Sequence, residues 1–323
     1  MWDAHNRRID YARVSITDRC NLRCLYCMPG DIPFIPHNDI LRYEEILRVC
    51  ATLAKLGVKT VRVTGGEPLV RKGCPDFLKE LKKVPGVKHI ALSTNAALLE
   101  PHIETLSKLE LDSLNISVDS LDPETYARIT GRDALSAVLG SLNAAIKAGL
   151  RVKVNFVPLR GLNDNEILPI ARLAEANPVD ARYIELMPSD AGNCVKGVTS
   201  DEVLAILANE YPDLKSDNSP RGFGPARYFV SARLRGAIGI IDAVSNRFCS
   251  SCNRLRLTST GFLKLCLFHG DGLDLRQMLR GGASDDDIES RIEEAVYNKP
   301  ESRQAQGGSN PESRIGRMSQ IGG

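Results

Sequence analysis

Short apolar runs alternate with helix-like stretches from Tyr11 to about Pro188, and this alternation constrains the fold more than any other feature. Six strand-then-helix units of this kind predict a parallel sheet with right-handed crossovers. The apolar runs are rich in Val and Ile, as expected of strands that are buried on both faces. The predicted strands are Ala12–Thr17, Thr60–Thr64, His89–Ser93, Ser113–Val118, Val152–Val157 and Tyr183–Met187. The predicted helices are Tyr43–Leu56, Pro75–Val84, Leu98–Leu109, Ala134–Ala148 and Glu166–Ala176.

Each predicted strand ends in polar or Gly-rich residues, which places chemically distinctive groups at one edge of the sheet. The second strand runs into Gly65-Gly66-Glu67-Pro68, and the sixth ends in Glu185-Leu186-Met187-Pro188. In parallel barrels the active site forms at the C-terminal ends of the strands. We therefore predict an α/β fold, an incomplete (β/α)6 TIM-like barrel with the active site at its mouth. An open doubly wound sheet satisfies the same alternation.

The pattern changes after about Asp190, where a smaller C-terminal domain is predicted. From Lys299 onward the chain is rich in Gly, Ser, Pro and Arg, and such a segment cannot form a core alone. We therefore divide the chain into a partial barrel at 1–190, a C-terminal region at 191–298 and a flexible tail at 299–323. The predicted C-terminal elements are a helix at Asp201–Glu210, strands at Ala237–Asp242 and Leu255–Thr258, and an amphipathic helix at Asp285–Val296.

Two cysteine triplets lie at opposite ends of the chain, Cys20-x3-Cys24-x2-Cys27 and Cys249-x2-Cys252-x13-Cys266. Each triplet supplies three thiolates, whereas a [4Fe–4S] cluster normally takes four cysteines. Three ligands leave one iron open, and an open metal position suits chemistry better than structure alone. The triplets therefore predict two [4Fe–4S] clusters, the second of them in the C-terminal domain.

Zinc and disulfide bonds are the alternative uses of these cysteines. A zinc site prefers paired CxxC units with four ligands, and each triplet stops at three without a histidine at ligand spacing. The chain has nine cysteines, an odd number, and it begins without the apolar stretch of a secretory signal. We therefore expect a cytosolic compartment that keeps the thiols reduced and free to bind metal.

The composition is that of an ordinary globular protein. The chain has 323 residues, of which 43% are hydrophobic and 25% are charged. A net charge of +2 argues against a general nucleic-acid or membrane binder. No apolar run approaches the length of a transmembrane helix. We expect a cytoplasmic protein that binds neither nucleic acid nor membranes.

Three cations fall on strands that the pattern predicts to be buried, namely Arg13, Arg62 and Lys153. A charge inside a buried strand is costly unless it meets a partner. An anionic ligand would supply that partner, and so would neighbouring Asp or Glu side chains. The residues alone leave both interpretations open.

Three segments carry a resemblance to known proteins. Cys20-Asn21-Leu22-Arg23-Cys24-Leu25-Tyr26-Cys27 resembles the CxxxCxxC signature of the radical S-adenosylmethionine (SAM) superfamily. Gly65-Gly66-Glu67-Pro68 resembles the GGEP motif of that superfamily, which meets the amino group of SAM. Cys249-Ser250-Ser251-Cys252-Asn253-Arg254-Leu255-Arg256, with Cys266 and a terminal Gly-Gly, resembles the GTP 3′,8-cyclase (molybdenum cofactor biosynthesis protein A) family. The resemblance covers nearly the whole chain, from Arg13 to Gly323.

The resemblance implies a lyase that converts GTP to 3′,8-cyclo-7,8-dihydro-GTP, in the first step of molybdenum cofactor biosynthesis. In the family, the first cluster binds SAM. Reductive cleavage of SAM yields a 5′-deoxyadenosyl radical, and this radical removes a hydrogen from C3′ of GTP. The C3′ radical then attacks C8 of guanine, which the second cluster holds. The implied partners are a flavodoxin- or ferredoxin-type electron donor, a downstream cyclic pyranopterin monophosphate synthase and a second copy of the chain in a homodimer.

The resemblance also implies, by position, which residues act. The cluster ligands are Cys20, Cys24, Cys27, Cys249, Cys252 and Cys266. The SAM contacts are Tyr26, Gly66, Glu67, Ser117 and Met187. The GTP contacts are Arg13, Arg62, Ser93, Lys153, Arg182, Arg254 and Arg256. Arg13 and the tail residues Gly322 and Gly323 are assigned to catalysis, because the Gly-Gly tail of the family inserts into the active site and aids the radical step.

Two departures and two alternatives accompany this interpretation. Ser93-Thr94-Asn95-Ala96 stands where the family commonly has Thr-Thr-Asn-Gly, and Ala96 takes a positive φ less easily than glycine, so we expect a different turn. The stretch Ser189–Ser200 is shorter than is usual in the family, so the resemblance does not predict the shape of the loop after Met187. A peptide-modifying radical SAM enzyme with an auxiliary cluster is the alternative function, although such domains usually carry more cysteines. An electron-transfer or structural iron–sulfur protein is the third possibility; ligation by four cysteines would support it, and neither triplet offers that.

Overall fold

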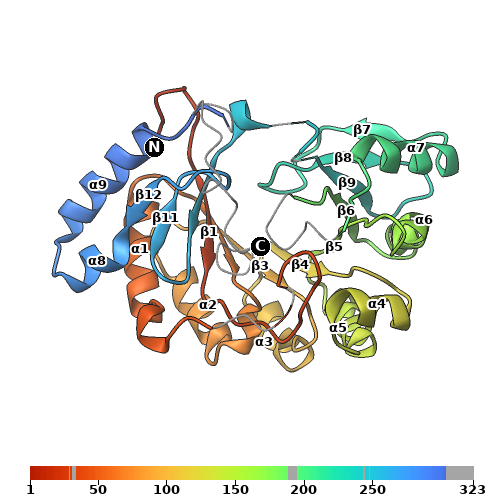
Figure 1. The fold of residues 1–323 in the computed structure, drawn as a ribbon, viewed down its shortest axis with the longest axis horizontal. Helices are drawn as coiled ribbons and strands as arrows, with labels where there is room; N and C mark the ends of the chain where they lie inside the picture. The colour runs from red at the N-terminus through yellow and green to blue at the C-terminus, as the bar shows by residue number, and fades with distance from the viewer. Residues whose placement is uncertain (29, 31–33, 188–194, 243, 247, 303–323) are drawn as a thin grey trace. The chain divides into compact units, whose positions relative to one another are not determined.

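The computed structural model describes residues 1–28, 30, 34–187, 195–242, 244–246 and 248–302, and these form an α/β fold (Figure 1). The chain divides into two compact units. Unit 1 comprises Met1–Asn21, Asp31–Leu92 and Phe248–Gly323, and unit 2 comprises Leu22–Gly30 and Ser93–Arg247. Both units are discontinuous in sequence, and the N-terminal and C-terminal segments belong to the same unit.

The sheet of unit 1 has the strand order β12-β11-β10-β1-β2-β3. β10 and β2 both run parallel to β1, whereas β11 and β12 are added to the edge in antiparallel pairs. The bounds are β1 Tyr11–Ser15, β2 Thr60–Thr64, β3 His89–Thr94, β10 Arg254–Leu257, β11 Phe262–Lys264 and β12 Gly272–Asp274. The helices are α1 Tyr43–Lys55, α2 Cys74–Lys82, α8 Leu275–Arg280 and α9 Asp285–Tyr297. α8 and α9 lie beside β11 and β12 (Figure 1).

Side chains alternate along the strands of unit 1. Val14 on β1 is the register partner of Val63 on β2 and of Leu257 on β10, and all three are fully buried. Because successive residues of a strand point to opposite faces, these side chains form an apolar layer on one face. The intervening residues lie on the opposite face, which carries the polar groups of the candidate site.

The sheet of unit 2 has the strand order β4-β5-β6-β9-β8-β7. β4, β5, β6 and β9 are parallel, and β8 and β7 continue the sheet in antiparallel pairs. The bounds are β4 Ser113–Ser117, β5 Val152–Phe156, β6 Asp180–Ile184, β7 Lys215–Asp217, β8 Arg227–Val230 and β9 Ala237–Ile241. The helices are α3 Ile103–Lys108, α4 Pro123–Thr130, α5 Leu135–Lys147, α6 Ile167–Ala176 and α7 Ser200–Glu210. α4 lies beside α5, and α6 beside α7 (Figure 1).

The predicted α/β class with a parallel sheet is confirmed, and the first five strands lie where the sequence predicted them. The sixth prediction was wrong in position, because β6 begins at Asp180 rather than at Tyr183. The predicted helix at Leu98–Leu109 is a 3-10 turn, Glu100–His102, followed by the shorter α3. The helix predicted at Pro75–Val84 is α2, which begins one residue earlier, at Cys74. The sequence did not predict α4, α8, β7, β8, β11 or β12.

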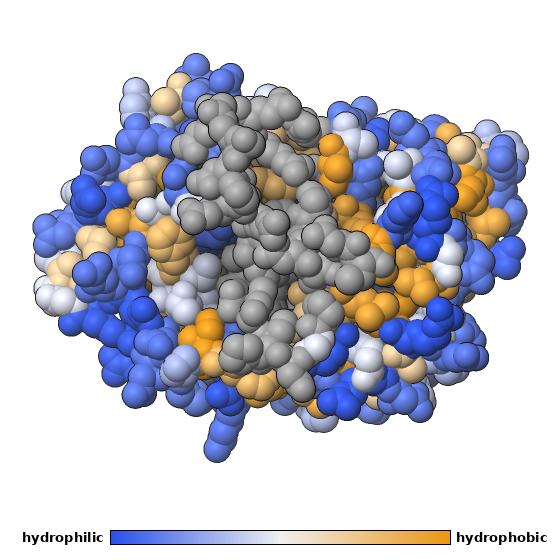
Figure 2. All heavy atoms as spheres, in the orientation of Figure 1, coloured by the Kyte–Doolittle hydropathy of each residue, from blue (hydrophilic) through white to orange (hydrophobic). Residues whose placement is uncertain are grey.

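The outer surface over α8 and α9 is mainly hydrophilic (Figure 2). α9 begins with three acidic residues, Asp285, Asp286 and Asp287, after the N-cap Ser284. Among the described residues, no helix is both long and apolar enough to cross a membrane.

Candidate active site

Four basic side chains form a row across four neighbouring strands of unit 1. Arg13 on β1 is the register partner of Arg62 on β2 and of Arg256 on β10, and Arg256 is in turn the partner of Lys264 on β11. Arg62 and Arg256 are each 7% exposed and Lys264 is 9% exposed. The alternation of the strands places all four on the polar face of the sheet. We call these four residues the cation row.

Burial and repulsion between like charges lower the pKa values of Arg13, Arg256 and Lys264. Burial, followed by the charges of Arg256 and Arg62, lowers the pKa of Arg13 well below its usual range. Burial and the charge of Arg254 lower the pKa of Arg256 to about 10. Burial and Arg256 also lower the pKa of Lys264. Because like charges crowded on one face repel, an anion with several charges is the ligand that this face suits best.

Tyr11 and Arg254 lie in the neighbouring row of the same sheet, as register partners. Tyr11 is 2% exposed, and its hydroxyl accepts a hydrogen bond from Arg62 Nε. Burial opposes ionisation of Tyr11, but the charges of Arg62 and Arg13 outweigh it and lower the pKa of the phenol. The Arg254 guanidinium lies 4.5 Å from the centroid of the Phe248 ring. Arg13, Arg62, Arg254 and Arg256 therefore lie on neighbouring strands of one sheet.

The second cysteine triplet lies in loops of unit 1 that flank these strands. Cys249 begins the 3-10 helix η6, Cys249–Ser251, Cys252 precedes β10, and Cys266 follows β11. All three thiols are half-buried and free. Burial by itself raises the pKa of Cys252, but the charges of Lys299 and Arg254 outweigh burial and lower it. The surroundings therefore favour the thiolate, which is the form that binds iron.

The first cysteine triplet is divided between the two units. Cys20 belongs to unit 1, and Cys24 and Cys27 belong to unit 2. Within unit 2, the amides of Cys27 and Met28 donate to Cys24 O at 3.0 and 2.9 Å, which closes a tight turn. The segment is fixed to the end of α4, because Arg23 N donates to Thr130 O at 2.7 Å and Leu25 N to Ile129 O at 2.9 Å.

The six predicted ligands differ from the other described cysteines. They are half-buried, whereas Cys50 and Cys74 are fully buried, which raises the pKa of each thiol to about 12. Among the described residues, no three His, Cys, Asp or Glu side chains are arranged to hold a metal ion. The donor chemistry of both triplets nevertheless fits cluster ligands, since each offers reduced, accessible thiols and Cys252 has cations beside it.

The Gly65-Gly66-Glu67-Pro68 loop packs against the chain that leads to Cys20. Gly66 N donates to Thr17 O and Glu67 N donates to Arg19 O, each at 2.8 Å. A Cβ atom on Gly66 would lie 2.5 Å from Arg19 O, so only glycine allows this approach. Glu67 is 1% exposed, and its side chain accepts from Leu69 N at 3.0 Å. The loop is therefore fixed to the segment that carries the first cysteine.

Three predicted SAM contacts, Tyr26, Ser117 and Met187, are half-buried residues of unit 2. Tyr26 Oη donates to Asp119 Oδ2 at 2.6 Å. Burial raises the pKa of Asp119 to about 6, against the opposing effect of the bonds from Tyr26 and Val157. Sequence reasoning did not single out Asp119, although it lies just beyond the end of β4.

Lys153 on β5 has an acidic partner in the structure. Its ammonium lies 3.5 Å from the carboxylate of Asp180, its register partner on β6, and the side chain is 2% exposed. Nζ also donates to Tyr228 Oη at 3.0 Å and to the carbonyl of Arg221. The acidic pairing that the sequence left open is thus present at Lys153.

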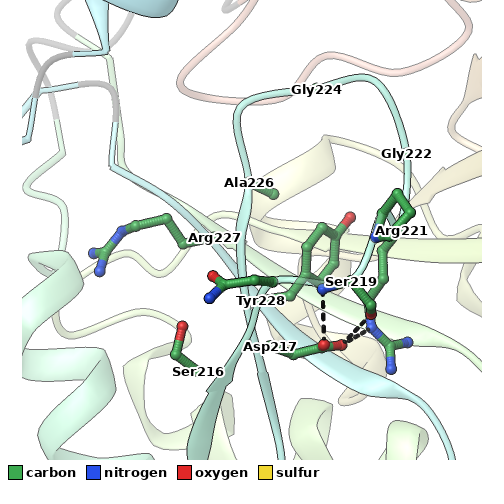
Figure 3. Close-up of a pocket in the computed structure, with 11 residues that line it drawn as sticks. Ser216, Asp217, Ser219, Arg221, Gly222, Gly224, Ala226, Arg227 and Tyr228 are labelled. Carbon is green, nitrogen blue, oxygen red and sulfur yellow. Dashed lines mark hydrogen bonds and ion pairs between the residues drawn. The ribbon is translucent and has the colours of Figure 1, made fainter.

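Arg221 belongs to a loop that lines a pocket of about 300 Å³ in unit 2 (Figure 3). Figure 3 shows Asp217 joined to Ser219 and Arg221, and the Arg221 Nε to Asp217 Oδ2 distance is 2.6 Å. Arg221 also pairs with Asp180 at 3.1 Å. Asp180 therefore balances two cations, Lys153 and Arg221, and sequence reasoning missed it.

Arg182 and Ser93 complete the predicted GTP contacts. Arg182 on β6 donates to the amide oxygens of Asn155, at 2.9 Å from Nε, and of Asn115, at 2.5 Å. Ser93 is half-buried near the end of β3. Ala96, for which we expected a different turn, adopts a φ of 62°, the left-handed conformation that glycine favours. Gly322, Gly323 and residues 189–194 of the short loop lie outside the described residues.

Two family models match the chain. Residues 14–174 match the radical SAM superfamily, and residues 179–305 match Molybdenum Cofactor Synthesis C. A GTP 3′,8-cyclase of Clostridium perfringens (strain SM101 / Type A) is 43% identical over 302 residues, which cover 93% of this chain and 94% of that protein. A GTP 3′,8-cyclase of Pelotomaculum thermopropionicum is 40% identical over 328 residues and covers 100% of both. The chain belongs to the GTP 3′,8-cyclase family.

Solved structures agree with this family on the fold. Streptococcus suis SuiB bound to S-adenosylmethionine has a TM-score of 0.65 at 14% identity, covering 88% of this chain and 69% of that one. A second structure of SuiB has a TM-score of 0.67 at 13% identity, covering 98% and 73%. At such identities the likeness establishes the fold alone. The assignment of this chain to the GTP 3′,8-cyclase family therefore rests on its sequence relatives.

Proposed function

We propose that this chain is a radical SAM lyase that converts GTP to 3′,8-cyclo-7,8-dihydro-GTP, in the first step of molybdenum cofactor biosynthesis. The observation that carries the proposal is the cation row, whose members Arg256 and Lys264 lie on β10 and β11, the strands that the loops of the second cysteine triplet flank. A face with several buried cations next to an iron-binding site suits a nucleotide triphosphate whose base reaches the metal. Relatives that are 40–43% identical over nearly the whole chain carry the same activity in their names.

Cys20, Cys24 and Cys27 would hold the first [4Fe–4S] cluster, and Cys249, Cys252 and Cys266 the second. The chemistry supplied at the first site is reductive cleavage of SAM to methionine and a 5′-deoxyadenosyl radical, and at the second it is an open iron for the guanine. The chain's own contribution is orientation, because Gly66 and Glu67 fix the loop before Cys20 and Tyr26 is fixed by Asp119. Ser117 and Met187 complete the proposed SAM contacts.

For GTP, we assign the triphosphate to cations and retain all seven predicted contacts. Arg13, Arg62, Arg254 and Arg256 offer donors from neighbouring strands of one sheet, and arginine grips phosphate oxygens at two points. Lys264 extends this set, since it occupies the cation row. The remaining contacts are Ser93, Lys153 and Arg182. Arg13 is also placed in catalysis, with Gly322 and Gly323 aiding the radical step.

Further proposals follow from the family alone. They are a flavodoxin- or ferredoxin-type electron donor, a downstream cyclic pyranopterin monophosphate synthase, a homodimer and a cytoplasmic location. The division at 1–190, 191–298 and 299–323 also remains a proposal. The peptide-modifying alternative has no observation in its favour here, since the likeness to SuiB shows only the fold.

Iron analysis and product detection on anaerobically purified protein test the proposal. We expect about eight irons per chain, from two [4Fe–4S] clusters. Changing Cys20, Cys24 and Cys27 together to Ala should leave about four irons and abolish 5′-deoxyadenosine formation. The matched change of Cys249, Cys252 and Cys266 should leave the other four and permit SAM cleavage without the cyclic nucleotide. 5′-Deoxyadenosine from the first triple variant, or no cyclic nucleotide from the unaltered protein, would contradict the assignment.

A further inference from the structure

Arg7, close to the N-terminus, holds the beginning of the C-terminal tail. Its Nε donates to Asp3 Oδ2 at 2.6 Å, which fixes the guanidinium. Nη1 donates to Glu301 O at 2.7 Å and Nη2 to Pro300 O at 2.6 Å. Nη1 also donates to Cys249 O at 2.9 Å, so one guanidinium joins the tail to the first cysteine of the second triplet. The Arg7 side chain is 5% exposed and that of Asp3 is 0% exposed.

Lys299 reaches from the same tail segment to the two other cysteines. Its Nζ donates to Arg254 O at 3.2 Å and to the carbonyl of Leu265, which directly precedes Cys266. Lys299 is 2% exposed and interacts electrostatically with the thiols of Cys252 and Cys266. Among the described residues, no carboxylate lies within ion-pair distance of its ammonium.

The two cations together contact the backbone at or beside each cysteine of the second triplet. Arg7 binds the carbonyl of Cys249, and Lys299 binds the carbonyls two residues after Cys252 and one residue before Cys266. Buried cations that bind carbonyls are costly unless enough negative charge lies nearby. Asp3 supplies that charge for Arg7, and thiolates that hold a cluster would supply it for Lys299. We call Arg7 and Lys299 the clasp.

We propose that the clasp positions the second cysteine triplet and tunes the cluster held there, so that the chain segment 299–301 is a working part of the iron site. The proposal rests on the proposed function, which places a cluster at this triplet. Groups that hydrogen-bond to and orient metal ligands typically change metal affinity about 10- to 100-fold when they are removed. Net charge and hydrogen bonding near a cluster also set its reduction potential.

The experiment uses a background in which Cys20, Cys24 and Cys27 are all Ala, so that all iron reports on the second triplet. In this background, Lys299→Met and Arg7→Met should lose iron to a chelator about 10- to 100-fold faster. Iron that remains in Lys299→Met should show a more negative midpoint potential by EPR redox titration, because a positive charge beside the cluster has been removed. A chain that ends at Ser302 should retain its iron, whereas one that ends at Asn298 should not.

Arg280→Met is the matched control. Arg280 is another guanidinium of unit 1 that donates to a carboxylate, that of Glu45, and to backbone carbonyls, those of Asn38 and Ile40, with no cysteine among its partners. This variant should lose stability and keep both the chelator rate and the midpoint potential. Equal iron loss in Arg280→Met would show a general effect of destabilisation and would overturn the proposal.

The outcomes separate the clasp from the proposed function. A background protein without iron would contradict the second cluster itself, and the clasp with it. A background protein that holds about four irons, with unchanged chelator rate and potential in both clasp variants, would overturn the clasp alone. If Lys299→Met does not fold, the Arg7→Lys variant tests the proposal instead. Lysine keeps the positive charge of Arg7 but lacks the two-pronged guanidinium that reaches several carbonyls. Faster iron loss with an unchanged potential supports the clasp there, and an unchanged rate overturns it.

Discussion

Ala96 adopts a backbone conformation that its side chain disfavours. Its φ is 62°, its side chain is fully buried, and its amide is held by Thr94 Oγ1 at 2.9 Å. For a residue with a Cβ atom, this left-handed conformation costs about 1–2 kcal/mol. The surrounding turn therefore imposes the conformation against the preference of alanine, and the alanine stores strain beside Ser93.

Replacing Ala96 with glycine should stabilise the protein. We expect the free energy of unfolding to rise by about 0.5–1 kcal/mol, because relief of strain exceeds the entropy that glycine adds to the unfolded chain. Urea unfolding measures the difference. Ala97→Gly is the control. Ala97 does not have a positive φ, so this variant should be less stable than the unaltered protein. A loss of stability in Ala96→Gly would show that the turn carries no strain.

Glu45 makes the free energy of unfolding depend on pH in the acidic range. Hydrogen bonds from Arg280, followed by one from Arg42 N, outweigh burial and lower the pKa of Glu45 from 4.5 to about 2. A lowered carboxyl pKa contributes stability that is present above pH 4.5 and is lost as the pH falls toward 2. Glu45→Gln should therefore cost about 2 kcal/mol at pH 7, and this difference should shrink steadily between about pH 5 and pH 2. Urea unfolding over that range measures it.

Glu104 provides the comparison for Glu45. Its carboxylate forms an exposed pair with Lys108 at 2.6 Å. Exposed pairs contribute little, because water screens them. Glu104→Gln should therefore show a much smaller difference, and a Glu45→Gln difference that is independent of pH would contradict the role assigned to Arg280.

Some candidate site residues could be proposed from the sequence, because residues with the same proposed role lie a few positions apart. Cys20, Cys24 and Cys27 belong to one such pattern. Lys264 was missed, although it alternates with Leu263 on a short strand and stands two residues before Cys266. The roles proposed for Arg7 and Lys299 could not be predicted, because their hydrogen-bond partners lie far away in the sequence. Arg7 and Cys249, for example, are 242 residues apart.

At the scale of single elements, α4 shows a signal that was present but unused. Asp122 is its N-cap, Pro123 follows at the first helical position, and Gly131 ends it in the left-handed conformation. These residues are typical start and stop signals of a helix. The helix is only eight residues long and buries few apolar side chains, so hydrophobic periodicity alone did not reveal it. Its end nevertheless holds the segment that carries Cys24 and Cys27.

Strand β6 was misplaced for a different reason. Its first residues, Asp180 and Arg182, alternate with Ala181 and Tyr183, so only one face is apolar. A search for apolar runs favours the later stretch up to Met187. The structure selects the earlier one because Asp180 and Arg182 point to the polar face, where their register partners are Lys153 and Asn155. The charged residues of this strand therefore lie on the polar face of the sheet and not in a loop.

Gly131 should matter more to the first cysteine triplet than Gly149 or Gly140 does. A Cβ atom there would lie 3.1 Å from Arg23 Cβ, and the φ is +69°. Gly131→Ala should cost about 1–2 kcal/mol in strain and should also speed iron loss from the first triplet, because it displaces the chain next to Cys24. Chelator kinetics in a background that lacks Cys249, Cys252 and Cys266 measure this effect.

Variants at two other glycines distinguish the effect of backbone strain from the effect of displacing the chain next to Cys24. Gly149 has a φ of +75°, and a Cβ atom added there would meet nothing within 4 Å, so Gly149→Ala should lose similar stability and keep its iron. Gly140 lies inside α5 with open space around it, and Gly140→Ala should gain about 0.5–1 kcal/mol. Equal iron loss in Gly131→Ala and Gly149→Ala would assign the effect to stability alone.

At the scale of the whole molecule, the sequence predicted the class of fold but not the discontinuity of the two units. The strand–helix alternation is local, and it identified β1 to β5. The parallel pairing of β10 with β1 is not local, and no spacing in the sequence specifies it. The cation row depends on that pairing. Its complete membership therefore required the three-dimensional structure.

Removal of Gly322 and Gly323 tests the proposed tail at this scale. Iron content, thermal stability and GTP affinity should change little, because two terminal glycines bury little apolar surface. Formation of the cyclic nucleotide should collapse, and adding a bulky residue after Gly323 should act similarly. Product analysis with GTP and SAM measures the effect. Cyclisation at the normal rate would show that chain ends here tolerate truncation, as most do.

The pairing of β1 with β10 also bears on how a ribosome can deliver this protein. Asp10 accepts a hydrogen bond from Asn253, which is synthesised 243 residues later. At about 5–20 residues per second, roughly 12–50 seconds of translation separate the two. During that interval one edge of β1 lacks its neighbour, and an unpaired strand edge invites association with other chains. A nascent chain stalled before residue 254 should therefore need a chaperone, although every residue of unit 2 has been synthesised by then.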